Sequence, residues 1–343
     1  MRHLQTRSLL KTAIGHTLWP LTNLLARRHV GGRRGLILTF HYVGDPILSG
    51  AADDLFLSRR VLTKVLDFVL SRLSPLSPLE FLERLSSGTL PHSATMLTFD
   101  DCTRDAVTEA LPELESRGLS ACFFVCPALI EQRRSVPSLE LMDACARAPE
   151  GEHRIRMAGF VQEDRRSEFA FGIRDAESRN TAFRTLWPIL FATPSSQHKA
   201  WLDGLRAQFG IDSTKPHTYP LADWNELARL HERGMWIGSH TMLHSTIAAD
   251  GAEQFAADVA AAYESLDARF PSARKIFCYP YGRPVDATDK ASLILEREGT
   301  EFAFVTQGGR ALPERDGHLR LRREDAAYSL GAAKLAPLLA LVR

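Results

Sequence analysis

Short apolar segments that alternate with helical stretches constrain the fold of this chain more than any other feature of its sequence. Strands that are apolar on both faces must be covered on both faces, which is typical of a parallel sheet in the α/β class. Six or seven such units favour a closed, barrel-like arrangement. The alternative is an open doubly wound sheet, but no Gly-x-Gly-x-x-Gly follows the first strand. The predicted strands are residues 36–40, 95–99, 121–125, 235–239, 275–279 and 302–306.

Capping signals mark the helices between these strands. Ser58 and the Ser77-Pro78-Leu79-Glu80 capping box each predict the start of a helix, and so does Asp223 with Glu226 three residues later. Glycines end several of the patterns, with Gly118 after a helix over 104–117 and Gly299 after one over 289–298.

The chain divides into three predicted parts. Residues 1–33 form a basic amphipathic arm, since residues 1–34 carry seven basic and no acidic side chains. Residues 34–325 form the barrel, which a helix-rich insertion interrupts at about 127–222. A stretch of that length is expected to be a lid or subdomain rather than a structureless loop. Residues 326–343 are expected to form a C-terminal helical tail.

Composition excludes several classes of protein. Hydrophobic residues make up 45% and charged residues 24% of the chain, which rules out disorder. The net charge of +1 disfavours nucleic-acid binding. Five cysteines without a Cys-x-x-Cys pair fit reduced thiols and a cytoplasmic location. No window offers the roughly 20 consecutive apolar residues of a transmembrane helix, so any membrane contact is expected to be peripheral and made by the basic arm.

Ionisable and turn-forming residues follow four of the predicted strands. Because the carboxyl ends of barrel strands gather at one face, these residues are expected to meet there. They are His41, the pair Asp100 and Asp101, the pair His240 and His244, and the turn Pro280-Tyr281-Gly282.

Two histidines four residues apart can bind one ion together with a carboxylate, which leaves positions open for water and substrate as in a catalytic zinc site. If one of the two aspartates binds the ion, the other is free to act as a base. Each feature also has an ordinary structural explanation: a chance histidine pair, a helix cap followed by a solvated charge, a loop histidine and a simple turn. Their joint placement at strand ends favours the functional interpretation.

At these residues the sequence resembles the polysaccharide deacetylases of the NodB-homology type, carbohydrate esterase family 4. Thr98-Phe99-Asp100-Asp101 looks like the first motif of that family. His240 to His244 looks like its His-Thr/Ser-x-x-His motif, and Tyr279-Pro280-Tyr281-Gly282 looks like its third motif.

This resemblance implies a distorted (β/α)7 barrel and a divalent metal, in most cases Zn²⁺, bound by Asp101, His240 and His244. It implies Asp100 as the general base and the Tyr281 N–H, between Pro280 and Gly282, as an oxyanion donor. The implied enzyme is a hydrolase of carbon–nitrogen bonds other than peptide bonds. It removes acetyl groups, preferentially N-acetyl groups, from an acetylated polysaccharide or oligosaccharide.

The chain departs from the pattern of the family at three places. Cys278 stands where the third motif begins with an arginine, and neither the Asp-x-x-Asp-Trp motif nor the Leu-x-His motif of the general acid is present. We take His41 as the first candidate for the acid and His318 as the second. The missing acid motif leaves a carbohydrate O-acetyl esterase and a catalytically degenerate carbohydrate-binding protein as alternatives.

The sequence also disfavours two other classes of protein, and it suggests roles for four tryptophans. Adjacent aspartates cannot easily straddle a glycosidic bond at about 5–9 Å, which disfavours a glycoside hydrolase. The ligand types disfavour a structural zinc site. Trp224 and Trp236 are the tryptophans considered for sugar stacking, with core packing preferred for Trp236, whereas Trp187 and Trp201 are expected to form a small core within the insertion.

Overall fold

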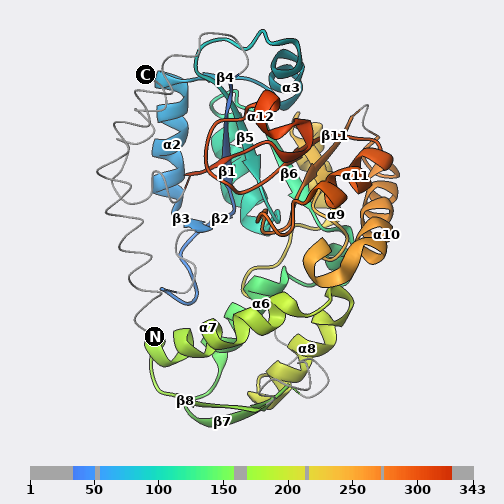
Figure 1. Cartoon of the computed structure of the whole chain (residues 1–343). Coiled ribbons are helices and arrows are strands. Elements are labelled where there is room, and N and C mark those ends of the chain that lie inside the picture. Colours follow the sequence, from blue (N-terminus) through green and yellow to red (C-terminus); the bar gives the residue numbers. More distant parts are fainter. Residues whose placement is uncertain (1–33, 51–54, 158–167, 213–215, 272–273, 327–343) are drawn as a thin grey trace, which may run out of the picture.

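A curled sheet of parallel strands forms the centre of the molecule (Figure 1). The computed structural model describes residues 34–50, 55–157, 168–212, 216–271 and 274–326. The strand order is β11-β10-β9-β6-β5-β1-β12, and the short β4 pairs with β5. The strands are β1 (Leu36–Phe40), β4 (Ser74–Pro75), β5 (Ala94–Phe99), β6 (Ala121–Val125), β9 (Trp236–Ser239), β10 (Lys275–Cys278), β11 (Thr300–Phe304) and β12 (Glu324–Asp325).

One segment near the end of the described chain joins the two edges of this sheet. Residues 321–325, here called the closing segment, pair with β11 through a parallel bridge between Leu321 and Phe304. The same segment pairs with β1 through β12, where Glu324 lies opposite Leu38. The predicted distorted (β/α) barrel is therefore confirmed, and the closing segment is a part of it that no apolar run had indicated.

Helices cover the outside of the sheet, and three of them begin at the predicted caps Ser58, Ser77 and Asp223. The side chain of Ser58 accepts a hydrogen bond from the Val61 N–H, and Asp223 and Glu226 form a reciprocal capping box. The expected helix over 104–117 is instead a π-helical turn followed by a short α-helix, beside Pro112, which has no N–H to donate. These elements are α2 (Arg59–Arg72), α3 (Pro78–Ser87), η2 (Ala106–Ala110), α4 (Leu111–Glu115), α9 (Trp224–Glu232), α10 (Ile247–Asp267), α11 (Asp289–Arg297), α12 (Pro313–Asp316) and η3 (His318–Arg320).

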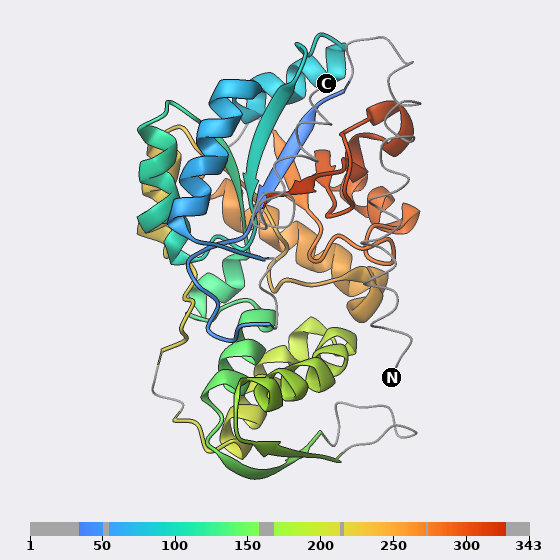
Figure 2. The same ribbon diagram turned by 90° about the vertical axis from the view of Figure 1, so that its left-hand side faces the viewer.

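The segment over 127–222 lies as a separate layer against one end of the barrel (Figure 2). It is rich in helices as expected, but it also contains an antiparallel hairpin of β7 and β8, which the sequence analysis did not predict although Phe169, Phe171 and Ile173 alternate along β8. Trp201 is 1% exposed and belongs to the core there. The elements are α5 (Pro127–Glu131), α6 (Pro137–Arg147), β7 (Gly151–Arg156), β8 (Glu168–Ile173), α7 (Ala176–Ala192) and α8 (Ser195–Gln208).

Several expectations from the sequence concern the ends of the chain and its thiols. The basic arm (1–33) and all but the first residue of the helical tail (326–343) lie outside the described residues. All five cysteines are free thiols and are buried. None of the helices in the described part of the chain has both the length and the apolar character that crossing a membrane requires.

Candidate active site

The two aspartates directly follow the central strand β5 and are both buried. Asp100 is 2% and Asp101 4% exposed. The N–H of Asp100 bonds to the carbonyl of Phe40 at 2.9 Å, which continues the pairing of β5 with β1. At Asp101 the backbone turns into the left-handed region, with φ of 64°. The two carboxylates therefore leave the strand end in different surroundings and can take different roles.

Both histidines belong to the loop after β9, and Asp258 of α10 fixes that loop. The Asp258 carboxylate accepts hydrogen bonds from the Met242 N–H at 2.7 Å and from the Ser245 hydroxyl at 2.6 Å. Burial raises the pKa of Asp258 to about 6. Sequence reasoning missed Asp258, because a lone acid within a long helix reads as a solvated charge.

Asp101, His240 and His244 meet as the resemblance implied. The Oδ1 atom of Asp101 lies 3.4 Å from His240 Nε2 and 3.3 Å from His244 Nε2. Ligands that bind one zinc ion tetrahedrally at about 2.0–2.1 Å are about 3.3 Å apart. Oδ1 is also a buried oxygen without a hydrogen-bond partner among the described residues. An unpaired buried oxygen between two imidazole nitrogens fits a divalent cation, and the donor set suits Zn²⁺.

The groups behind these ligands fix their orientation. The hydroxyl of Tyr42 donates a short hydrogen bond to Asp101 Oδ2, which leaves Oδ1 facing the histidines. Burial, together with the nearby charge of Asp101, raises the pKa of Tyr42 well above its usual value and keeps it protonated as a donor. His240 Nδ1 lies 2.8 Å from the carbonyl oxygen of Cys278, which directs Nε2 toward the cation site. Tyr42 is a second residue that the sequence analysis passed over, although it adjoins His41.

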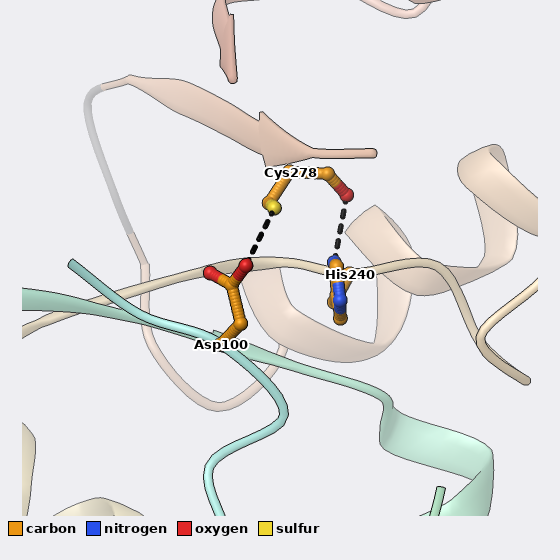
Figure 3. A group of neighbouring side chains, drawn as sticks. All are labelled: Asp100, His240 and Cys278. Carbon is orange, nitrogen blue, oxygen red and sulfur yellow. Dashed lines mark hydrogen bonds between the residues drawn. The ribbon is translucent and has the colours of Figure 1, made fainter. Parts of the chain in front are cut away.

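A second group of three metal-binding side chains overlaps the first. It consists of Asp100, His240 and Cys278, which Figure 3 shows around the end of β10. Here the ligand atoms are already engaged, because Nδ1 of His240 bonds to the Cys278 carbonyl and the Cys278 thiol lies 3.4 Å from Asp100 Oδ2. The set of Asp101, His240 and His244 therefore suits a cation better.

A buried arginine from the closing segment holds Asp100. Nη1 and Nη2 of Arg323 bond to the two oxygens of Asp100 at 2.7 and 2.6 Å, and the Arg323 side chain is fully buried. Burial alone would raise the pKa of Asp100, but the Arg323 guanidinium outweighs it and lowers the pKa to about 2. Arg323 Nη2 also lies 3.1 Å from the sulfur of Cys278. Cys278 occupies the position where an arginine was expected, and Arg323 reaches the same carboxylate from another strand.

His41 lies at the end of β1, between two carboxylates. Its Nε2 is 3.7 Å from Asp100 Oδ2, and its Nδ1 is 3.9 Å from Asp325 Oδ2. The ring is partly exposed and lines the cavity described below. His318 is exposed instead, stacks on Phe302 with ring centroids 5.2 Å apart, and is not among the residues that line this cavity.

The Pro280-Tyr281-Gly282 turn follows β10 and brings Tyr281 beside the histidines. The rings of Tyr281 and His244 meet edge to face, with centroids 4.5 Å apart. Among the described residues no backbone carbonyl accepts a hydrogen bond from the Tyr281 N–H. Gly282 has φ of 56°, and a Cβ atom there would lie 2.4 Å from the N atom of Thr306, so no side chain fits. Within the turn, Pro280 and Gly282 are buried, whereas Tyr281 lines the cavity described below.

Unusual backbone conformations gather at this end of the barrel. Seven residues other than glycine have positive φ among those described, and five of them lie in the loops of the site. Such conformations cost of order 1–3 kcal/mol each and persist where the surrounding structure enforces them. Their concentration here indicates a functional site. The five are Asp101, Cys102, Thr241, His244 and Tyr281.

A cavity of about 820 Å³ opens above these residues. The strand ends supply the polar residues of its wall, and the segment over 127–222 supplies Ser138, Trp187, Pro188 and Phe191. Trp187 was expected to pack in a core of its own, but it lines this cavity. Trp224 and Trp236, which were considered for sugar stacking, do not line it; each packs against a hydrophobic cluster.

Residues 194–301 match the model of the family described as polysaccharide deacetylase. The resemblance is thereby confirmed. The match includes His240, His244 and the Pro280-Tyr281-Gly282 turn, and it supports a deacetylase hydrolase activity. Both aspartates lie before the matched residues. No curated protein sequence matches the chain.

Solved structures of deacetylases share the fold over most of the chain. The deacetylase PplD of Streptococcus pyogenes, in complex with acetate, has a TM-score of 0.57 at 16% identity, over 90% of this chain and 98% of that one. IcaB from Ammonifex degensii has a TM-score of 0.53 at 17% identity, over 89% and 98%. A polysaccharide deacetylase from Bacillus cereus, BC0361, has a TM-score of 0.53 at 12% identity, over 90% and 69%. These likenesses establish the fold, a barrel that this chain shares with those proteins.

Proposed function

We propose that this protein is a metal-dependent deacetylase that removes N-acetyl groups from an acetylated polysaccharide or oligosaccharide. The observation that carries the proposal is a buried site for a cation beside a second carboxylate, Asp100, that is not one of the cation's proposed ligands. Asp101, His240 and His244 would hold the cation, and Asp100 lies beside it, oriented by Arg323. When bound, a divalent cation such as Zn²⁺ acts as a Lewis acid on the acetyl carbonyl and lowers the pKa of water.

The side chains around this site divide the remaining chemistry among them. Asp100, ionised throughout the neutral range because its pKa is about 2, accepts the proton of the attacking water. The Tyr281 N–H donates to the oxygen on which negative charge develops. His41, between Asp100 and Asp325, gives a proton to the leaving nitrogen. An amine leaves poorly without that proton, whereas the alkoxide of an ester leaves more readily.

Release of acetate from acetylated oligosaccharides tests this assignment. Replacing Asp100 with Asn should retain zinc and lower kcat by about 10²–10⁴-fold. His240→Ala should lose both zinc and activity. His318→Ala, at an exposed histidine outside the cavity, is the matched control and should change neither. Wild-type turnover by the Asp100→Asn protein would refute the mechanism.

The choice between N- and O-acetyl groups depends on His41. His41→Asn should lower the hydrolysis of an N-acetylated oligosaccharide much more than that of an O-acetylated one, because only the amine needs a proton to leave. An equal effect on both substrates would contradict the role of His41 as the acid. Metal-dependent sugar binding without release of acetate from either substrate would point to a degenerate carbohydrate-binding protein.

For the cellular location of the protein and its contact with membranes, we retain the predictions made from the sequence. Five free, buried thiols support a cytoplasmic location. The basic arm over 1–33 would provide peripheral contact with an anionic membrane. Sedimentation with vesicles containing phosphatidylserine tests this contact, since deletion of the arm should abolish it.

A further inference from the structure

The cavity above the cation site has two chemically different kinds of lining. The ends of the barrel strands contribute its acids and bases, including His41, Asp100 and Asp325. Helix α7, which is not part of the barrel, contributes Trp187, Pro188 and Phe191. A substrate in this cavity can therefore contact aromatic rings as well as the reacting groups.

Trp187 and Phe191 form one surface, because residues four apart lie on the same face of a helix. Their ring centroids are 5.7 Å apart, and both rings are partly exposed. Trp201, in the neighbouring helix α8, is 1% exposed and serves only the core. Trp187, a partly exposed large ring at the cavity wall, is therefore available to a ligand, whereas the Arg283 guanidinium covers a face of Phe191.

Contacts with the active site fix these two rings in place. Phe191 lies 4.4 Å and Trp187 5.7 Å from the ring of Tyr281, measured between centroids. Tyr281 in turn contacts the ring of His244. The guanidinium of Arg283 lies 3.2 Å from the centroid of Phe191 and is held by two hydrogen bonds to Asp286. A continuous series of ring contacts thus joins a metal ligand to α7, so little side-chain entropy is lost on binding.

We propose that Trp187, supported by Phe191, is the platform for the sugar ring that carries the acetyl group, a role that rests on the function proposed above. Aromatic faces provide large, flat apolar contact area. A pyranose ring with equatorial substituents, as in N-acetylglucosamine, has a matching face of axial C–H groups. Ligand sites combine such apolar walls with a few polar groups that fix orientation. The segment over 127–222 therefore contributes a residue that selects for a pyranose with such a face beside the reacting groups.

The affinity for an N-acetylglucosamine oligosaccharide tests this role. We would measure it by calorimetry on zinc-loaded protein in the Asp100→Asn background, so that the sugar is not consumed, and measure KM in the wild-type background. Trp187→Leu, which keeps an apolar side chain but removes the flat ring, should weaken binding and raise KM by about tenfold. Trp187→Phe, which restores a flat ring, should stay within about threefold of the parent.

Zinc affinity and the thermal midpoint of the Leu variant show whether the substitution disturbs the structure. The proposal expects both to equal the values of the parent protein. Equal binding by the Leu and Phe variants, or a parent protein that binds no such oligosaccharide, would overturn the platform. Loss of zinc in the Leu variant would also overturn it, since Trp187 would then act through the metal site. Failure of the proposed function is separate: it would appear as ring-dependent sugar binding without acetate release by the wild-type protein.

Discussion

Arg323 and Tyr42, which contact the two aspartates of the candidate site, control the charge and orientation of those carboxylates. Arg323 and Asp100 form a buried ion pair whose two charges are expensive to separate. We expect Arg323→Met to lower the free energy of unfolding by about 3–5 kcal/mol, because it leaves Asp100 charged and unpaired. The double variant Arg323→Met/Asp100→Asn should regain most of that loss, as urea unfolding of the four proteins would measure. Additive costs would contradict direct coupling between the two residues.

The hydroxyl group of Tyr42 provides a second prediction, which concerns the affinity of the site for zinc. Tyr42→Phe removes the hydroxyl that donates to Asp101 Oδ2, so the carboxylate is free to rotate. Loss of a partner behind a metal ligand typically costs 10–100-fold in affinity, and we expect a change of that size in competition titrations with a zinc chelator. Tyr219→Phe is the matched control, since its ring belongs to the same aromatic cluster but its hydroxyl bonds to the Asp45 carbonyl. Equal effects of the two variants would assign the loss to packing instead.

The sequence was sufficient for the residues that share short motifs and not for those that come from distant segments. The strand-end rule placed the aspartate pair at the same face as His240 and His244, because it needs only strand direction and local spacing, and the family resemblance singled out Asp101. Arg323 could not be found this way. It lies 223 residues from Asp100 along the chain, and in Arg320-Leu321-Arg322-Arg323 nothing distinguishes the buried arginine from its partly exposed neighbours. The burial of Arg323 depends on closure of the sheet, which is a property of the whole barrel.

At the scale of secondary-structure elements, the patterns predicted helices and buried strands better than they predicted exposed ones. The hairpin of β7 and β8 was missed because β7 is mostly charged and exposed, and because the alternating Phe169, Phe171 and Ile173 of β8 lie within a stretch that was interpreted as helix-rich. The strand at 302–306 was expected two residues too late, since Thr300 pairs with Lys275 before the apolar run begins.

In the segment over 127–222, His217 makes the free energy of unfolding depend on pH. Its Nε2 lies 3.4 Å from Glu140, but burial and the nearby Arg206 lower the pKa of His217 to about 4. Between pH 6.5 and 4 the unfolded chain therefore binds a proton that the folded chain does not, and the free energy of unfolding falls as pH falls. Relative to His217→Gln, the wild-type protein should lose about 1 kcal/mol between pH 7 and pH 5, after allowance for solvent screening. Urea unfolding at both pH values measures this, and parallel losses would exclude His217 as the cause.

For the whole molecule, a cation held by Asp101, His240 and His244 would link the ends of β5 and β9 and should stabilise the fold. A ligand that binds only the folded state adds about 2.7 kcal/mol at a free concentration 100 times its Kd. We therefore expect zinc to raise the thermal midpoint and a chelator to reverse the change. His244→Ala should abolish the response, and His318→Ala should keep it. A midpoint that does not respond to zinc in the wild-type protein would count against the cation site.

The closing segment has a consequence for how the enzyme matures. In chain order it comes after every other strand of the barrel, so a nascent polypeptide emerging from the ribosome carries both aspartates before Arg323 has been translated. Until then the sheet has two open edges and Asp100, the proposed base, lacks its counter-charge. Under the proposed function we therefore expect hydrolytic competence and completion of the barrel to be acquired together, and cleavage ahead of residue 321 to remove both at once.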